Sequence, residues 1–429
     1  MRSSWSAWPE QLHFESRIRI DFARAAKSQT TARAASELVV ELDEVGEVAG
    51  SNHREAITTA ASGTESPNSL ILLRFLFLLL LLFGFLVGLD MMGLAFKLFG
   101  KGFAETLIES TSNPFVGLFI GILATTLVQS SSTTTSMTVG LVAAGALTIE
   151  GAIPIIMGAN IGTSVTNTLV SLAHVTRREE FQRAFAGATI HDFFNWMAVL
   201  ILLPLELATG YLAKTAGFLE AALEGVGGIK LLNPLKEVVR PVSQGLASIL
   251  GESGALVLIL GIVLLIASLK FLVDILKALM TGRAERTLHR TLFRSPWSAM
   301  VAGLAITAMV QSSSITTSLM VPLVGAGVVT LEQVFPFTIG ANIGTTVTAM
   351  LAALATGSPA AVTVAFSHLM FNVTATLLIY VPPPMRAIPL RLARSLGRLG
   401  SRNRILAGVY IVTVFFGLPI LLLFLAGTF

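Results

Sequence analysis

The sequence predicts an all-α polytopic membrane protein in which two inverted-topology repeats, with broken or re-entrant helices, surround a site near the bilayer midplane. Three observations lead to this fold class. The chain has 429 residues and is 53% hydrophobic and 13% charged, about half the charged share of a soluble protein. Apolar stretches of about twenty residues, the length that crosses a bilayer, recur after residue 69. Two polar strings each occur twice, with 182 residues between the copies.

The N-terminal residues 1–68 differ from the rest of the chain. They are rich in charged residues and show no sustained periodicity, so we expect a cytosolic tail without fixed structure. No short basic start is followed by an apolar run, and a signal peptide is therefore not expected. The first predicted span is 70–89. Residues 91–112 are amphipathic and are expected to re-enter the bilayer or to lie at its interface.

Arginines gather in three loops, 177–183, 281–294 and 386–404. The positive-inside rule places these loops in the cytoplasm. Counting spans from a cytosolic N-terminus puts Pro114, which opens the first repeat, on the outer side, and Pro296, which opens the second, on the inner side. The two repeats are therefore predicted to be inverted, an arrangement that places a shared site at their interface.

The segments follow one another in a simple order. Clear spans are predicted at 184–205, 256–280 and 405–426. We divide the chain into a tail (1–68), a first span with an interfacial helix (69–112), repeat one (113–206), a linker (207–253), a span with a basic cytosolic loop (254–294), repeat two (295–383), and a basic cytosolic loop with the last span (384–429).

The first duplicated string is Gln129-Ser130-Ser131-Ser132, which recurs as Gln311-Ser312-Ser313-Ser314. Polar side chains in an apolar stretch are costly unless something bonds to them. A run of serine and threonine alone often serves only to pack helices closely or to bond to a backbone carbonyl. Here both copies carry a glutamine, and packing alone does not require both amides. Such duplicated polar strings are typical of secondary transporters.

The second duplicated string, Gly-Ala-Asn-Ile-Gly-Thr, occupies 158–163 and 340–345. Its glycines and asparagine predict a broken helix, whose free N–H groups favour anions and whose free carbonyls favour cations. The alternative is a glycine packing face, because Gly158 and Gly162 have the spacing of a small-residue motif.

A third and weaker repeat, called the H-x-x-F-N echo below, is the sequence His191-Asp192-Phe193-Phe194-Asn195. The same H-x-x-F-N pattern recurs at residues 368–372. We expect each copy to open a span and each histidine to be a hydrogen-bonded packing residue. Asp192 differs because its counterpart, Leu369, is neutral, and a carboxylate inside a membrane indicates a cation site. The alternatives for Asp192 are a helix N-cap or an ion-pair partner for Arg183.

The chemistry of the repeats favours an anion accompanied by cations. The predicted spans carry hydroxyls and amides but no arginine beyond Arg74. Neutral donors would therefore bind an oxyanion whose charge is balanced by Na⁺ held on hydroxyl and carbonyl oxygens.

Other classes of function are not supported. No nucleophile–base pair stands out, which argues against an enzyme. The basic loops are explained by membrane orientation and require no nucleic acid. The chain has no cysteine, which excludes disulfides and thiol chemistry.

Five segments make the resemblance to one family specific: 128–133, 153–163 and 180–187 in repeat one, and 311–314 and 340–346 in repeat two. Over about residues 70–425 the chain resembles the type II sodium-dependent phosphate cotransporters, and specifically a bacterial-type member. Unlike the animal members, it has a short linker without cysteine between the repeats. The resemblance also implies a further span after residues 405–426, so we expect either a shortened bacterial-type member or a truncated gene.

The resemblance implies electrogenic symport of inorganic phosphate with Na⁺ as the coupling ion and no cofactor, in the plasma (inner) membrane, with a cytosolic N-terminus. The residues it implies for phosphate are Gln129, Ser130, Ser131, Gln311, Ser312 and Ser313. Those it implies for sodium or for the helix breaks are Asp192, Thr133, Ser132, Asn160, Thr163, Ser314, Asn342 and Thr345. The alternatives are a Na⁺-coupled carrier of another oxyanion or small carboxylate, and a membrane sensor that binds phosphate without transporting it.

Overall fold

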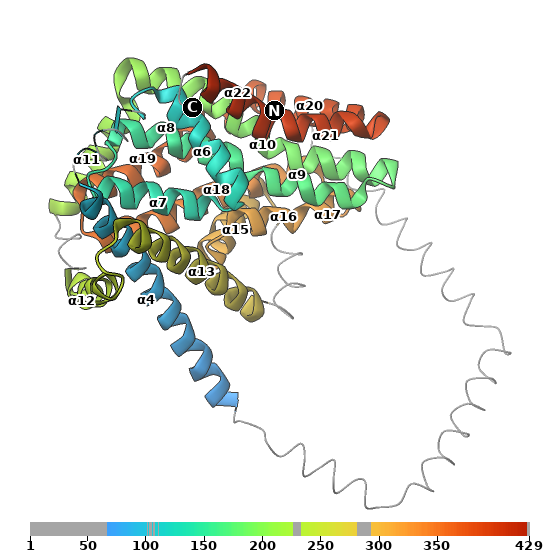
Figure 1. The fold of residues 1–429 in the computed structure, drawn as a ribbon. Coiled ribbons are helices and arrows are strands. Elements are labelled where there is room, and N and C mark those ends of the chain that lie inside the picture. Colours follow the sequence, from blue (N-terminus) through green and yellow to red (C-terminus); the bar gives the residue numbers. More distant parts are fainter. Residues whose placement is uncertain are drawn as a thin grey trace, which may run out of the picture. The chain divides into compact units, whose positions relative to one another are not determined.

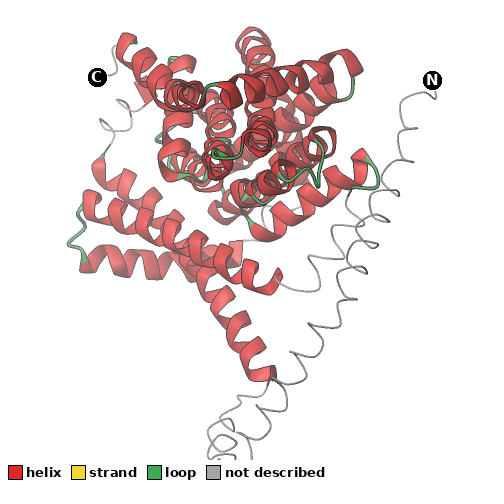
Figure 2. Ribbon diagram, turned by 90° about the vertical axis from the view of Figure 1, so that its right-hand side faces the viewer, coloured by secondary structure: helices red, strands yellow, loops and turns green. Residues whose placement is uncertain are grey.

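The computed structural model describes residues 67–100, 102, 105, 108–109, 111–225, 233–280 and 293–426, and all regular structure in these residues is helical (Figure 2). The chain divides into two compact units, Met1–Leu73 and Arg74–Phe429. Of the first unit only residues 67–73 are described, and they begin helix α4. The predicted tail therefore lies almost wholly outside the described residues, whereas the all-α prediction is confirmed.

Seven helical stretches in the described part of the chain are long and apolar enough to cross a bilayer. This confirms the polytopic prediction. The stretches are Leu76–Phe99, Ile149–His174, Arg178–Thr209, Gly254–Phe271, Leu331–Thr356, Pro359–Tyr380 and Arg404–Leu425.

Helix α4 (Pro67–Phe99) is longer than the predicted first span, and the expected interfacial segment does not begin at residue 91. The helix continues because Met91, Met92 and Ala95 are buried in a hydrophobic cluster with α13 (Gly254–Met280). The two helices approach closely, since a Cβ added at Gly88 would lie 2.9 Å from the Gly261 carbonyl oxygen. Figure 1 shows α4 and α13 side by side.

Repeat one begins with a hairpin of two helices that are too short to cross a bilayer, α6 (Pro114–Val128) and α7 (Ser131–Ala143). The hydroxyls of Thr125 and Thr134 bond across the hairpin at 2.9 Å. The chain then runs through α8 (Ile149–Thr163), α9 (Val165–Ser171) and η1 (Leu172–His174), and returns as α10 (Arg178–Thr209). The predicted re-entrant element is thus a hairpin whose tip is the Q-S-S-S string.

Repeat two has the same order of elements. A hairpin of α15 (Pro296–Val310) with α16 (Ser313–Ser318) and α17 (Met320–Gly325) is followed by α18 (Leu331–Thr356), and then by α19 (Pro359–Ala375), which continues as η3 (Thr376–Tyr380). The tip of this hairpin is the second Q-S-S-S string. Figure 1 shows the helices of both repeats within the same part of the molecule.

The prediction that Gly-Ala-Asn-Ile-Gly-Thr breaks a helix is wrong for repeat two, where helix α18 runs without interruption through the string. In repeat one, α8 ends at Thr163, the last residue of the string, and α9 begins at Val165. The glycines instead allow helices to touch: a Cβ at Gly158 would lie 2.0 Å from the Leu118 carbonyl oxygen, and a Cβ at Gly340 would lie 1.9 Å from that of Met300. The alternative reading, a glycine packing face, is the correct one, and it has the same geometry in both repeats.

Three further segments complete the described chain. The predicted linker contains α11 (Tyr211–Gly225) and α12 (Asn233–Ile249). The predicted basic loop after repeat two is a helix, α20 (Pro383–Arg402), which packs so closely on α10 that a Cβ at Gly397 would lie 2.6 Å from the Gln182 carbonyl oxygen. The last span is formed by α21 (Arg404–Val412), η4 (Thr413–Gly417) and α22 (Leu418–Leu425).

The order of these elements is consistent with inverted repeats. With a cytosolic N-terminus, α4 runs outward, α8 to η1 inward, α10 outward, α13 inward and α18 outward. The equivalent helices α8 and α18 then run in opposite directions, and α20, with its many arginines, lies on the inner side as the positive-inside rule requires. The inversion itself stays a prediction.

Candidate functional site

Both hairpin tips are built on a glutamine in the left-handed conformation. Gln129 is the C-cap of helix α6, with φ 55°, and Gln311 is the C-cap of helix α15, with φ 57°. Only one other non-glycine residue in the described part of the chain has a positive φ, Glu252. Such backbone conformations are unfavourable for residues with a Cβ and concentrate at functional sites. The glutamines therefore mark the two places where each repeat reverses direction.

A serine caps the next helix in both tips. The Ser130 hydroxyl accepts a hydrogen bond from the Thr133 amide at 3.2 Å and another from the Thr133 hydroxyl at 2.9 Å. In the second tip the Ser312 hydroxyl accepts from the Ile315 amide at 3.4 Å. A helix begins with four N–H groups that have no partner within the helix. The first turns after the two caps thus supply backbone donors, together with the positive end of each helix dipole.

The two tips meet. The Ser132 hydroxyl donates to the Gln311 carbonyl at 2.9 Å, so repeat one bonds directly to the break in repeat two. The Gln311 side chain is fixed by the Thr348 hydroxyl, which donates to its Oε1 at 2.8 Å, and by its own amide, which donates to the Ala308 carbonyl. Gln129, by contrast, is exposed.

The remaining predicted phosphate residues lie in the same two tips. Ser131 and Ser313 are buried in the first turns of α7 and α16, and their carbonyls accept from Thr135 and Thr317 at 2.8 Å. Ser314 is also buried. The structure therefore brings together the serines that were predicted from the duplicated string.

The predicted sodium residues fall into two groups. Thr133 lies at the first tip with Ser132, whereas Thr163 and Thr345 bond to the carbonyls one turn earlier in their helices, at 2.8 Å and 3.1 Å. Asn160 and Asn342 are buried inside α8 and α18. The threonines are thus bonded within their own helices, but Asn342 belongs to a wider network.

This network joins the repeats through buried side chains. The Asn342 amide donates to Asn195 Oδ1 at 2.8 Å, and Asn342 Oδ1 lies 2.7 Å from His191 Nε2. Because an amide oxygen can only accept, His191 Nε2 carries the proton. Its Nδ1 then accepts from the Asn167 amide at 3.3 Å, and Asn167 Oδ1 accepts from the Thr317 hydroxyl at 3.0 Å.

The network was only partly predictable. His191 is a hydrogen-bonded residue, as expected, but it lies within α10 and does not open it. Asn195, the last residue of the H-x-x-F-N echo, also donates to the Asn160 carbonyl at 2.6 Å. The sequence pattern does not predict a role for Asn195 in the site. Thr317 belongs to the Ser/Thr run that continues the second Q-S-S-S string. Nothing in the sequence singles out Asn167 or Thr348, since one polar residue in an apolar stretch gives no distinguishing signal.

Asp192 is fully buried within α10. Its Oδ2 accepts a hydrogen bond from the Tyr410 hydroxyl at 3.0 Å, and the Ser164 side chain also lies beside the carboxylate. Its Oδ1 has no partner at full hydrogen-bond geometry among the described residues. Both alternatives for this residue are wrong. It is not an N-cap, because α10 begins at Arg178, and it does not pair with Arg183, whose guanidinium donates to the Gly325 carbonyl at 2.8 Å.

The second copy of the echo is not bonded in the same way. His368 and Asn372 are buried in α19, so the expectation that this copy opens a span is also wrong. Neither ring nitrogen of His368, nor Asn372 Oδ1, has a hydrogen-bond partner in the described part of the chain. The Asn372 amide donates only within its own helix, to the His368 carbonyl at 3.0 Å. The expectation of a hydrogen-bonded histidine is therefore met at His191 but not at His368.

Comparisons with known proteins agree with this architecture. A family model described as Na⁺/Pi-cotransporter matches residues 84–219 and 264–381. The chain is 37% identical to sodium-dependent phosphate transport protein 2A of Mus musculus, over 84% of this chain and 68% of that protein. It is 36% identical to the 2A protein of Ovis aries (81% and 67%) and 35% identical to the 2B protein of Homo sapiens (81% and 64%). No solved structure shows a significant match.

Proposed function

Because the chain belongs to the Na⁺/Pi-cotransporter family, we propose that it is a secondary transporter that couples inward movement of Na⁺ to uptake of inorganic phosphate by alternating access. The observation that carries the proposal is the contact between the two tips, in which Ser132 of repeat one bonds to the Gln311 carbonyl of repeat two. This is where a substrate shared by the two repeats would lie.

Phosphate is bound between the tips by neutral donors. The hydroxyls of Ser130, Ser131, Ser312 and Ser313 and the amide of Gln129 supply donors, and the first turns of α7 and of the helical stretch 313–325 supply backbone N–H groups. The Gln311 side chain is already bonded to Thr348 and Ala308. Gln311 therefore contributes through its backbone, which forms the turn between α15 and the next helix. Neutral donors alone leave the charge of phosphate uncompensated, which is why the cations must bind with it.

Asp192 supplies a cation site. Its Oδ1 is a hard oxygen ligand in a spanning helix, where a buried carboxylate with only neutral neighbours, Tyr410 and Ser164, is costly, and a bound Na⁺ would lower that cost. Binding there adds one positive charge to the loaded transporter. Transport is therefore electrogenic, with Asp192 setting the charge balance. Hydroxyl and amide oxygens at Ser132, Thr133, Ser314, Asn160 and Asn342 are the further candidates for Na⁺.

The asymmetry of the buried networks supports alternating access. His191 and Asn195 bond to Asn342 across the repeats, whereas the equivalent His368 and Asn372 side chains make no bond to the described residues of repeat one. Two repeats that exchange conformations during transport would differ in this way in any one state.

The protein lies in the plasma (inner) membrane with its N-terminus in the cytosol. In this orientation a cysteine introduced at Glu252 would react with a reagent added outside, and one introduced at Arg402 with a reagent added inside. The reverse labelling would contradict this orientation.

Uptake of radiolabelled phosphate into proteoliposomes tests the function. An imposed inward Na⁺ gradient should drive accumulation, and replacement of Na⁺ by K⁺ should abolish it. Strong competition by excess sulfate or succinate would indicate a carrier of other anions. Na⁺-dependent phosphate binding without any uptake would indicate a sensor.

A further inference from the structure

A polar cavity lies away from the hairpin tips. It has a volume of about 150 Å³ and is lined by residues of α4, α7, α12 and α18. Its walls are the C-terminal half of α4, the end of α7 and the end of α18, together with the middle of α12. On the predicted topology all of these segments lie at the outer end of the spans.

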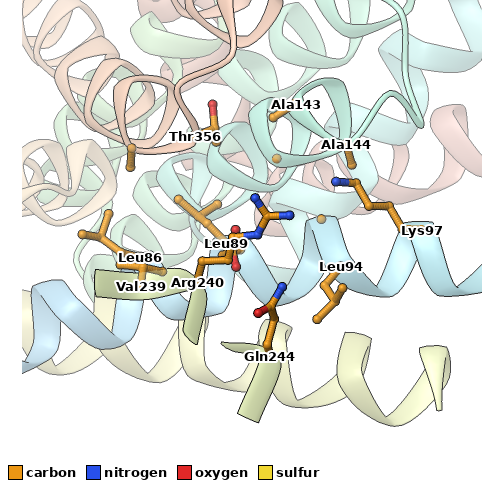
Figure 3. A pocket seen from close by; sticks show the side chains of 14 residues that line it. Leu86, Leu89, Leu94, Lys97, Ala143, Ala144, Val239, Arg240, Gln244 and Thr356 are labelled. Carbon is orange, nitrogen blue, oxygen red and sulfur yellow. The ribbon is translucent and has the colours of Figure 1, made fainter. Parts of the chain in front are cut away.

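Two cationic side chains point into this cavity. Figure 3 shows the ammonium group of Lys97, from α4, and the guanidinium of Arg240, from α12, directed into the same space from opposite sides, with the Gln244 amide below them. Among the described residues neither Lys97 nor Arg240 has a salt-bridge partner. Two positive charges that share a cavity repel one another unless an anion lies between them.

The nearby carboxylate does not cancel this charge. Asp90 also lines the cavity, and one of its oxygens accepts a hydrogen bond from the hydroxyl of Ser243, which is fully buried. This bond fixes α12 against α4 and so holds Arg240 in place opposite Lys97. One acid and two bases leave the cavity with a net positive charge.

The other walls leave room and suit an amphiphilic ligand. Gly140, Ala143 and Ala144 of α7 are small, and a Cβ added at Gly140 would make an ordinary contact of 3.5 Å with Leu89. The Thr356 side chain and the Gln244 amide add neutral polar groups, while Leu86 and Val239 at one end and Leu94 at the other add apolar groups (Figure 3). A water molecule needs about 10–15 Å³ of such a cavity, so a phosphate group fits together with some water.

We propose that this cavity binds the phosphate group of an anionic ligand at the outward-facing surface of the plasma membrane, through Lys97, Arg240 and Gln244. The phosphate comes from one of two sources, free inorganic phosphate or the headgroup of an anionic phospholipid, since both present charged phosphate oxygens that Lys and Arg bind through charge-assisted hydrogen bonds. The site is separate from the hairpin tips and does not depend on Na⁺ or on transport.

The absence of cysteine from the chain provides a direct test. Ala144→Cys places one thiol on the cavity wall without removing a polar group, and its rate of reaction with N-ethylmaleimide reports whether the cavity is filled. The full-length protein is reconstituted in phosphatidylcholine nanodiscs in Na⁺-free potassium buffer, with and without inorganic phosphate. A second set of nanodiscs contains phosphatidylglycerol. Chloride keeps the ionic strength equal throughout.

We expect phosphate, phosphatidylglycerol or both to slow the reaction about tenfold, since a charged cavity concentrates counter-ions by at least that factor. Slowing by phosphate identifies the free ion, and slowing by phosphatidylglycerol alone identifies the lipid. Adding Lys97→Gln and Arg240→Gln together should abolish the protection, and either substitution alone should reduce it. Because the cations also affect thiol reactivity, the ratio of rates with and without the anion is compared, not the rate itself.

Lys214→Gln is the matched control, because Lys214 is an exposed lysine at the same predicted side that does not line the cavity. It should leave the protection unchanged. Protection that is absent with both anions, or that persists in the double variant, would overturn the proposal. Size-exclusion elution of each variant confirms that the compared proteins are folded.

Discussion

The hydroxyl of Ser132 donates a 2.9 Å hydrogen bond to the backbone carbonyl of Gln311, 179 positions further along the chain. The acceptor is the residue at which helix α15 ends, and carbonyls at a helix end have no partner within the helix. Repeat one therefore satisfies a buried group that the break in repeat two leaves open. This bond makes the geometry of each tip depend on the other.

Ser132→Ala should weaken phosphate transport without unfolding the protein. A neutral hydrogen bond contributes about 0.5–1.5 kcal/mol, so we expect the KM for phosphate to rise about twofold to tenfold. Ser136→Ala is the control, because Ser136 is buried on the same helix and its hydroxyl has no partner among the described residues. Equal KM values for the two variants in proteoliposome uptake would show that the contact between the tips does not hold the substrate site together.

Gln129→Gly should separate the backbone role of this glutamine from its side-chain role. Glycine adopts the φ of 55° without strain, so the melting temperature of the variant should equal or exceed that of the parent. Uptake should fall, because the exposed amide proposed to contact phosphate is lost. Gln129→Ala keeps the strain, which costs about 1–2 kcal/mol, and also loses the amide. If uptake by the glycine variant equals that of the parent, the amide does not contact phosphate.

Asp192→Gly should remove the voltage dependence of uptake while leaving transport measurable, since the charge that Na⁺ balances is gone. Tyr410→Phe is the control: it removes the hydrogen bond to Oδ2 but keeps the carboxylate, so charge movement should persist. The measurement is the current per phosphate transported at several membrane potentials. An unchanged current per phosphate in Asp192→Gly would assign Asp192 a structural role with Tyr410.

Gly158→Ala and Gly340→Ala should each destabilise the protein. The added methyl groups would lie 2.0 Å and 1.9 Å from backbone carbonyl oxygens, which cannot move aside as a side chain can. Overpacking of this kind costs about 1–3 kcal/mol, which should appear as a lower melting temperature in detergent. Gly217→Ala, with no atom within 4 Å of the added Cβ, should be neutral or slightly stabilising. No difference among the three variants would refute the packing role.

The duplicated strings predicted the fold well because they repeat a local requirement. The Q-S-S-S string combines a residue that ends one helix with a serine that caps the next, and both tips obey this pattern. The Gly-Ala-Asn-Ile-Gly-Thr string does not predict a helix break reliably, because glycine serves equally well where a helix breaks and where two helices touch, and α18 continues through the string. Only the position of Leu118 and Met300 decides between these roles.

The buried network was less predictable because its partners come from different repeats. His191 and Asn342 are 151 positions apart, and Asp192 finds its partner Tyr410 218 positions away. Nothing local in the sequence encodes these pairings. The position of Asp192 within its helix was also missed, because α10 begins with charged residues that were assigned to the preceding loop.

The central claim is that the two tips hold one phosphate together with Na⁺, and protection of single cysteines tests it most directly. Ser130→Cys and Ser312→Cys are introduced separately into the cysteine-free chain, and only variants that retain measurable uptake are compared. Phosphate in Na⁺ buffer should slow the reaction of both cysteines with a thiol reagent, at the same half-protecting concentration, and should not slow it in K⁺ buffer. Protection of only one cysteine, or protection that is independent of Na⁺, would contradict a single shared site.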